Sequence, residues 1–138
     1  MAKAGILSVT REHDMIFESL SLVARRDNRR ELQASLSFLL GPTRVESGCL
    51  SCHLYQDVSN PNGFSFECLW KTEADFLRHL RSEIYKQLLI LMELSAEKPT
   101  VQFHKILETQ GLELVHAARK HKSDPGSAES DLGFQSHE

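Results

Sequence analysis

The sequence predicts an α+β fold in which strands and helices follow the order βαββαβ. Three observations carry this prediction. Four segments have strand-like patterns, two segments between them carry leucines at helical spacing, and a turn-rich run lies mid-chain. The order strand–helix–strand therefore occurs twice. This is the split βαβ, or ferredoxin-like, arrangement, with one antiparallel sheet and both helices on one of its faces.

The first strand and the first helix occupy the N-terminal third of this unit. Residues 14–24, DMIFESLSLVA, combine alternation with β-favouring residues and predict the first strand. The charged run 25–30 follows as a turn in which Asp27 or Asn28 is placed to cap a helix. Leucines at positions 32, 36, 39 and 40 then have helical spacing. We expect Pro42 to kink or end this helix, because proline has no backbone donor.

A β-hairpin is predicted for the middle of the chain. Residues 49–58 and 64–70 have strand patterns, and the run between them, SNPNG, is dense in turn formers. If Val58 lies near Phe64, one face of the hairpin is almost wholly apolar and packs under the helices. That face carries Leu50, Cys52, Leu54, Val58, Phe64, Phe66, Cys68 and Trp70.

The C-terminal half completes the unit and extends beyond it. A second helix begins at Thr72 or Glu73 and ends before Lys98-Pro99. Residues 100–108 predict the fourth strand, and the pattern leaves the type of the short element 111–121 open. We therefore divide the chain into four parts. They are an N-terminal extension 1–13, a domain of residues 14–108, an extra C-terminal element 109–121, and a polar, flexible tail 122–138.

Bulk composition excludes several classes of protein. The chain has 138 residues, which suits one domain with its own core. Its net charge is −3, so no positive field attracts phosphates, and we expect no nucleic-acid partner. The longest apolar run, 88–92, is too short to cross a bilayer, and the N-terminus lacks the pattern of a secretion signal. Three cysteines fit reduced thiols. We expect a cytoplasmic protein without a membrane partner.

The stretch 49–53, CLSCH, matches the signature of covalent haem attachment and contains the C-x-x-C of redox and metal sites. Residues three apart on a strand point to opposite faces, so Cys49 and Cys52 would diverge and could not share one haem or metal. In the expected register Cys52 lies near Trp70 and diagonal to Cys68. We therefore interpret Cys52 and Cys68 as small buried hydrophobes, and we expect no metal or other cofactor.

An ordered set of residues runs from the first predicted helix to the second. It comprises Pro42-Thr43-Arg44, Glu46, Gly48-Cys49-Leu50-Ser51, Tyr55-Gln56-Asp57, Asn60-Pro61-Asn62, Phe64, Trp70, Phe76 and His79-Leu80. In these residues the chain resembles the antibiotic biosynthesis monooxygenase (ABM) domain family, over about residues 14–108. The resemblance implies a ferredoxin-like monomer that pairs into a homodimeric α+β barrel. Members include cofactor-independent oxygenases of quinols or polycyclic phenols, haem-degrading proteins and proteins of no known activity, so membership alone does not fix the chemistry.

Trp70 and His79 match family positions that often line the pocket, and we predict catalytic roles for both. Trp70 ends its strand on the helix-facing side, and His79 lies three residues after Phe76, close to the apolar helix face. A histidine is the natural base for taking a proton from a phenol or quinol, whose anion can pass an electron to O₂. An indole can hold an aromatic ring by stacking. The alternative is structural: His79 hydrogen-bonded at the edge of the core, and Trp70 within it.

The same cavity is expected to have an apolar lining. The residues predicted to line it are Leu54, Phe66, Cys68, Phe76 and Tyr85.

The chain departs from the family pattern at two places. Relatives commonly have Glu two residues before the Trp, where this chain has Cys68, and Glu67 lies on the opposite strand face. Haem-degrading relatives use an Asn on the first strand, and residues 14–24 contain none.

The sequence therefore supports three hypotheses in order. The first is a homodimeric, cofactor-independent monooxygenase of a small aromatic or quinol-type substrate. The second is a non-catalytic small-ligand-binding or accessory domain of the same fold, which the loss of Glu at Cys68 favours. The last is a haem-binding or haem-degrading protein that uses CLSCH.

Overall fold

A computed structural model describes residues 14–122 of the chain. The predicted N-terminal extension and almost all of the predicted tail lie outside the described residues. The chain divides into two compact units between Leu107 and Glu108.

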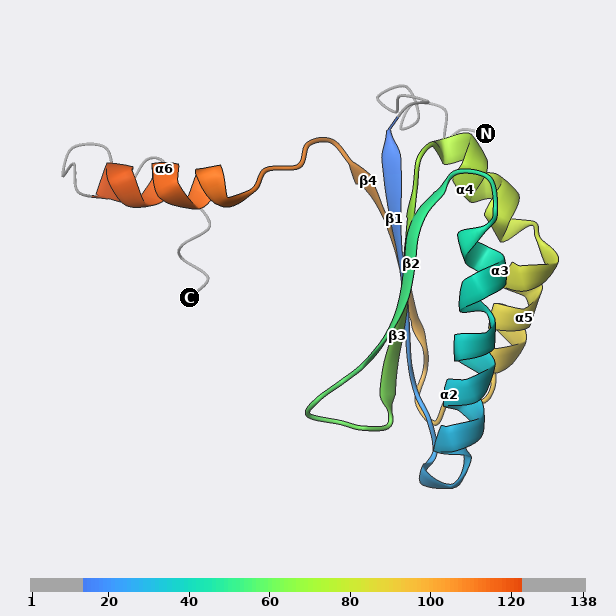
Figure 1. The fold of residues 1–138 in the computed structure, drawn as a ribbon. Coiled ribbons are helices and arrows are strands. Elements are labelled where there is room, and N and C mark those ends of the chain that lie inside the picture. Colours follow the sequence, from blue (N-terminus) through green and yellow to red (C-terminus); the bar gives the residue numbers. More distant parts are fainter. Residues whose placement is uncertain (1–13, 123–138) are drawn as a thin grey trace. The chain divides into compact units, whose positions relative to one another are not determined.

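The first unit contains an antiparallel sheet of four strands in the order β2-β3-β1-β4 (Figure 1). The strands are β1 (Met15–Val23), β2 (Cys49–Gln56), β3 (Gly63–Trp70) and β4 (Thr100–Ile106). Each connection through helices skips one strand, so β3 lies between β1 and β2, and β1 lies between β3 and β4. This is the split βαβ topology, and the prediction of a ferredoxin-like α+β fold is confirmed.

The helices of this unit cover one face of the sheet (Figure 1). After the 3₁₀ turn Arg26–Asn28 come α2 (Arg29–Phe38) and α3 (Leu40–Arg44), and after the hairpin come α4 (Glu73–Leu80) and α5 (Glu83–Met92). Each predicted single helix is therefore two.

The two helix breaks have different causes. The first predicted helix breaks at Leu39, near the expected kink, because Pro42 has no backbone N–H to donate to the carbonyl four residues before it. Pro42 itself lies in the first turn of α3, where a missing N–H costs little. The second predicted helix is interrupted at Arg81 and Ser82 and restarts at Glu83. Ser82 is the N-cap of the new helix, and its hydroxyl accepts the backbone N–H of Tyr85 at 3.1 Å.

The core lies between the sheet and the helices. Along β1 the burial alternates strictly, with Ile16, Glu18, Leu20 and Leu22 buried toward the helices. The alternation is typical of a strand with one face against a core.

The hairpin differs from its predicted register. Cys52 pairs directly with Cys68 rather than lying near Trp70, and a β-bulge at Leu50 shifts the register so that Cys49 pairs with Trp70. A bulge inserts one unpaired residue and exchanges the faces beyond it. Leu50 is consequently half exposed, while Cys49, expected on the opposite face, packs against the core. The prediction that Cys49 and Cys52 diverge is therefore wrong.

Val58 was also placed on the core face by pattern, and it is 99% exposed. The strand ends at Gln56, so Val58 belongs to the connecting turn and no longer follows the alternation of β2.

The second unit contains the helix α6 (Leu112–Lys122). The short element at 111–121, whose type the sequence pattern leaves open, is therefore a helix. Within residues 14–122, no helix is long and apolar enough to span a membrane.

Candidate functional site

Trp70 and His79 lie stacked against each other at the centre of the core. Their ring centroids are 4.4 Å apart with an interplanar angle of 29°, and both residues are 0% exposed. Tyr85 meets the imidazole edge-on, with centroids 5.3 Å apart. The structure thus brings the two residues with predicted catalytic roles into direct contact, in a place that solvent does not reach.

Glu18 supplies a buried carboxylate to both rings. It lies on β1, directly opposite Cys68 of β3, and it is 1% exposed. One carboxylate oxygen accepts the indole N–H of Trp70 at 2.9 Å, and the other lies 3.3 Å from Nε2 of His79. The position two residues before Trp70 holds a cysteine, but a carboxylate from the neighbouring strand occupies the same region of the core.

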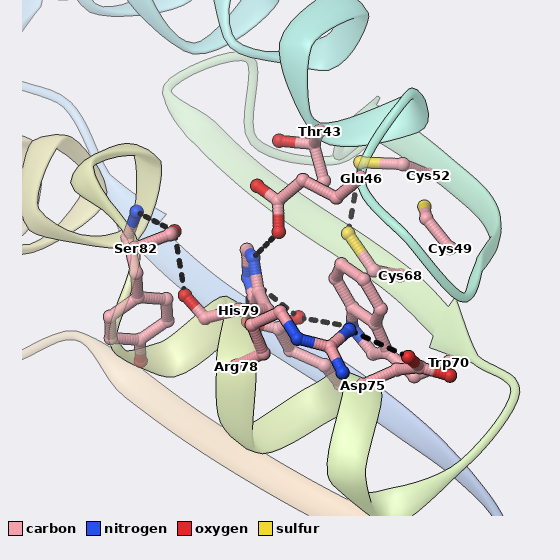
Figure 2. Close-up of polar contacts among 12 residues, drawn as sticks. Thr43, Glu46, Cys49, Cys52, Cys68, Trp70, Asp75, Arg78, His79 and Ser82 are labelled. Atoms are coloured by element: carbon pink, nitrogen blue, oxygen red, sulfur yellow. Dashed lines mark hydrogen bonds and ion pairs between the residues drawn. The ribbon is translucent and has the colours of Figure 1, made fainter.

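Glu46 approaches His79 from the opposite side. Its Oε1 lies 3.0 Å from Nδ1 of His79 (Figure 2). With Glu18 at Nε2, both ring nitrogens face carboxylates. Burial lowers the pKa of His79, but the hydrogen bond and charge of Glu18, together with those of Glu46, outweigh burial and raise the pKa above its ordinary value. The arrangement therefore favours the imidazolium, which donates from both nitrogens.

Turns at the ends of α4 fix the position of His79. Thr72 caps the helix by accepting the backbone N–H of Asp75 at 3.1 Å, and its hydroxyl donates to the Asp75 carboxylate at 2.8 Å. At the other end, the hydroxyl of Ser82 donates to the backbone carbonyl of His79 at 2.7 Å. Both caps anchor the short helix that carries the imidazole.

The loop that carries Glu46 is held close to the same helix. Gly48 has a φ of +84°, which favours glycine, and a Cβ there would collide with the carboxylate of Asp75. The carbonyl of Gly48 accepts the backbone N–H of Lys71 at 2.8 Å. Close packing of this loop on α4 brings Glu46 within hydrogen-bonding distance of His79.

A pocket of about 300 Å³ lies beside the outer carboxylate of the cluster. Glu46 and Ile84 contribute to its wall, with Arg78 and Ser82. The Glu46 side chain is 18% exposed, while its Oε2 is buried and accepts no hydrogen bond from the described residues. Glu46 therefore connects the buried cluster to a space that can hold a small molecule, since ligand sites begin at about 300 Å³.

The residues predicted to line a cavity are part of the packed core instead. Phe66, Cys68, Phe76 and Tyr85 are buried, and Leu54 packs against them half-buried. Phe76 touches Phe103 of β4, with ring centroids 4.9 Å apart. Tyr85 meets His79 directly, and the other four side chains belong to the same hydrophobic core as Trp70.

The CLSCH motif does not form an open ligand site. Cys52 is 0% exposed, and its Sγ accepts the S–H of Cys68 at 2.9 Å. The half-buried Cys49 directs its S–H to the carbonyl of Ser51, at 3.5 Å. Within residues 14–122, no group of three or more His, Cys, Asp or Glu side chains is arranged to hold a metal ion.

Glu18 and Glu46 are the residues of the cluster to which sequence reasoning gave no role. The signal for Glu18 was present: it is the only charged residue among the inward positions of an otherwise apolar, alternating strand. A buried carboxylate is rarely found without a partner, so it invites a search for one. For Glu46, which lies in a loop, local pattern carries no comparable signal.

The comparisons with known proteins agree with this fold. Residues 15–89 match the model of the family described as antibiotic biosynthesis monooxygenase. An uncharacterised protein of Synechocystis is 27% identical over 100 residues, covering 72% of this chain and 68% of the relative.

Solved structures show the same fold. A protein of Mycobacterium tuberculosis has a TM-score of 0.63 at 22% identity, covering 70% of this chain and 99% of that one. A candidate antibiotic biosynthesis monooxygenase from Deinococcus radiodurans has a TM-score of 0.64 at 21% identity, covering 70% and 96%. The family match spans more than half of the chain and includes β1, the hairpin and the helix that carries His79. The chain therefore belongs to the antibiotic biosynthesis monooxygenase family.

Proposed function

We propose that this protein is a monooxygenase that oxidises a small aromatic or quinol-type molecule with O₂ and needs no metal or flavin. The observation that carries the proposal is the buried row Glu18–His79–Glu46, whose outer carboxylate lines a pocket. Family membership supplies the reaction class as a prior. The row is a chain of proton-carrying groups that leads from the pocket into a dry core.

The proposed role of the row is to remove the proton of a phenolic O–H. A substrate ring lies in the pocket beside Ile84, and its hydroxyl faces the Glu46 carboxylate, whose Oε2 accepts no hydrogen bond from residues 14–122. Reaching this oxygen requires the carboxylate to turn toward the pocket. His79, already protonated between the two carboxylates, passes its Nε2 proton to Glu18 as its Nδ1 takes up the proton from Glu46. Arg78 lines the same pocket and pairs through Nη1 with Asp75 at 2.8 Å, and its remaining N–H groups can stabilise the resulting phenolate.

In the oxidation that follows, the substrate itself supplies the electrons that reduce O₂. The phenolate passes one electron to O₂, and the radical pair combines to a hydroperoxide. Loss of water then leaves one oxygen atom on the ring. For a quinol, the overall change is quinol plus O₂ giving hydroxyquinone plus H₂O. The substrate supplies all four electrons, so the reaction requires no added reductant.

Oxygen uptake with a panel of quinols and naphthols tests the proposal. We expect substrate-dependent uptake by the wild type, and at least a tenfold loss of kcat in Glu46→Gln, since a positioned acid–base group contributes about 10²–10⁴-fold. Glu31→Gln is the matched control, because Glu31 is an exposed carboxylate of α2 outside the cluster. Equal uptake by the wild type and Glu46→Gln would remove the row from the mechanism.

A homodimer remains part of the proposal. The sheet face opposite α2–α5 carries aromatic residues among polar ones, including Phe17, Tyr55 and His104, with Phe17 and His104 stacked at 6.1 Å. Pairing of two such faces would bury them. Sedimentation equilibrium tests this proposal, and a monomer at micromolar concentration would contradict it.

A cytoplasmic location is likewise a prediction, which cell fractionation tests.

A non-catalytic ligand-binding domain is the second candidate. The observation that favours it is the complete burial of Trp70 and His79, which lets the cluster act as a polar core without meeting a ligand. The two functions differ in one result. A binding domain would take up an aromatic ligand in the pocket, detected by calorimetry, without consuming O₂.

A further inference from the structure

Two cysteines of the hairpin face each other inside the core. Cys52 of β2 and Cys68 of β3 are direct partners in the antiparallel ladder, and their exposed fractions are 0% and 1%. Their Sγ atoms are 2.9 Å apart, with the Cys68 thiol donating to Cys52 (Figure 2). Neither thiol belongs to the proton row described above.

We propose that Cys52 and Cys68 form an oxidisable dithiol, which peroxide converts to an intramolecular disulfide between β2 and β3. The proposal rests on the pairing and the sulfur geometry, and it holds whether or not the protein is an oxygenase.

The backbone is already arranged for this bond. Directly opposed residues in an antiparallel pair have Cα atoms about 4.5–5.5 Å apart, which lies within the range of about 4.4–6.8 Å that disulfides span. A disulfide bond is about 2.05 Å long, so the sulfurs need to approach by only roughly 1 Å. The bond therefore requires no strand to move to a new register.

The reaction balances with hydrogen peroxide as the oxidant. One thiolate attacks a peroxide oxygen, which gives a sulfenic acid and releases one water after protonation. The second thiol then attacks the sulfenic sulfur, and the hydroxyl group leaves with a proton as a second water. Two thiols lose two electrons and two protons, and the peroxide is reduced to two water molecules.

The surroundings make this a slow reaction at neutral pH. The hydrogen bond between the two cysteines, burial, and the nearby charge of Glu18 raise the pKa of the Cys68 thiol. Burial and the neighbouring Cys52 and Glu46 raise the pKa of Cys49 to about 11. Since the thiolate is the nucleophile, we expect the oxidation rate to rise with pH and with local opening of the hairpin.

The bond would form next to the candidate site. Cys68 lies between Cys52 and Glu18 across three adjacent strands, and Trp70 follows two residues later on the same face. Because Trp70 is the single tryptophan of the chain, its fluorescence reports a change at this level of the core. Disulfides quench nearby indoles, so oxidation should lower the emission.

Peptide mapping by mass spectrometry after peroxide treatment of the full chain tests the proposal. We expect the wild type and Cys49→Ser to lose the mass of two hydrogen atoms, with Cys52 and Cys68 in one linked peptide and with lower Trp70 fluorescence. Cys52→Ser should show neither change. Mapping of the wild type alone decides the question if that variant does not fold.

Three results would overturn the proposal. They are a Cys49–Cys52 bridge, a bridge between two chains on a non-reducing gel, and three thiols still free after peroxide treatment at alkaline pH. A dithiothreitol step that restores the original mass and fluorescence is the expected control, because disulfide formation is reversible.

Discussion

Removal of the His79 imidazole should lower the stability of the fold, because the imidazole is the shared partner of two carboxylates. His79→Ala leaves the carboxylates of Glu18 and Glu46 without their shared cation, in a region where His79 and Glu18 are 0% and 1% exposed. Removing one partner of a buried ion pair costs about 3–5 kcal/mol, because the remaining charge stays buried. Domains are stable by only about 5–15 kcal/mol, so the variant should lose a large part of its stability.

Urea denaturation, followed by circular dichroism at pH 6, measures this loss as a lower midpoint with an unchanged slope. Glu18→Gln provides the second arm of a double-mutant cycle. It removes one negative charge and keeps an oxygen that can accept the indole N–H of Trp70. The double variant should be less destabilised than the sum of the single variants, with a coupling of about 0.5–3 kcal/mol.

Two results would refute this reasoning. A loss below about 1 kcal/mol in His79→Ala would mean that the carboxylates are not held by the imidazole, since that is the range of exposed pairs. Strict additivity in the cycle would mean that Glu18 and His79 do not interact despite their 3.3 Å separation.

The remaining predictions concern pH, the Glu46 loop and the helix cap. The raised pKa of His79 means that the folded state binds the proton more tightly, so its stabilisation is complete below the ordinary pKa of about 6.5 and is lost as pH rises through the folded value. Denaturation midpoints between pH 6 and 9 should fall in the wild type, and a parallel fall in His79→Gln would contradict the assignment. Gly48→Ala should destabilise the protein by about 1–3 kcal/mol through its positive φ and its collision with Asp75, and an unchanged thermal midpoint would show that the loop adapts. Ser82→Ala should cost about 0.5–2 kcal/mol through loss of the cap of α5, whereas Ser82→Asp should retain most of the stability.

The arrangement of strands and helices could be predicted because local pattern and topology agree. The alternation in β1 and the SNPNG turn fix which faces are apolar, and the right-handed crossover of strand–helix–strand units leaves few arrangements. The break in the second helix was missed for a local reason. Ser82 is an ordinary residue on a continuous apolar helical pattern, and only the structure shows that it caps a new helix.

Two features of the hairpin differ from the predicted register. Gln56, rather than Val58, pairs with Phe64, so the pairing is displaced by two residues without exchanging the two faces, and a bulge at Leu50 moves Cys49. Leu50 is apolar, so alternation places it in the core, and nothing in the local sequence marks a bulge there. The bulge moves Cys49 to the core side. Alternation determines register only where the strand is regular, and a bulge breaks this rule.

Two residues of the candidate site, Trp70 and His79, could be predicted from the sequence. Trp70 and His79 follow from their positions on a strand and a helix that face each other, and the structure places them in contact. Glu18 was detectable as a charge at an apolar position. Glu46 was not, because its approach to His79 depends on a tertiary contact between the Gly48 loop and α4.

The most direct test of the account is an NMR titration of the His79 imidazole in protein labelled at histidine. The account predicts that His79 titrates above the ordinary value of about 6.5, and that its pKa falls in both Glu18→Gln and Glu46→Gln. A His79 that titrates at or below the ordinary value, and is unaffected by either substitution, would contradict the proton row on which the proposed chemistry depends.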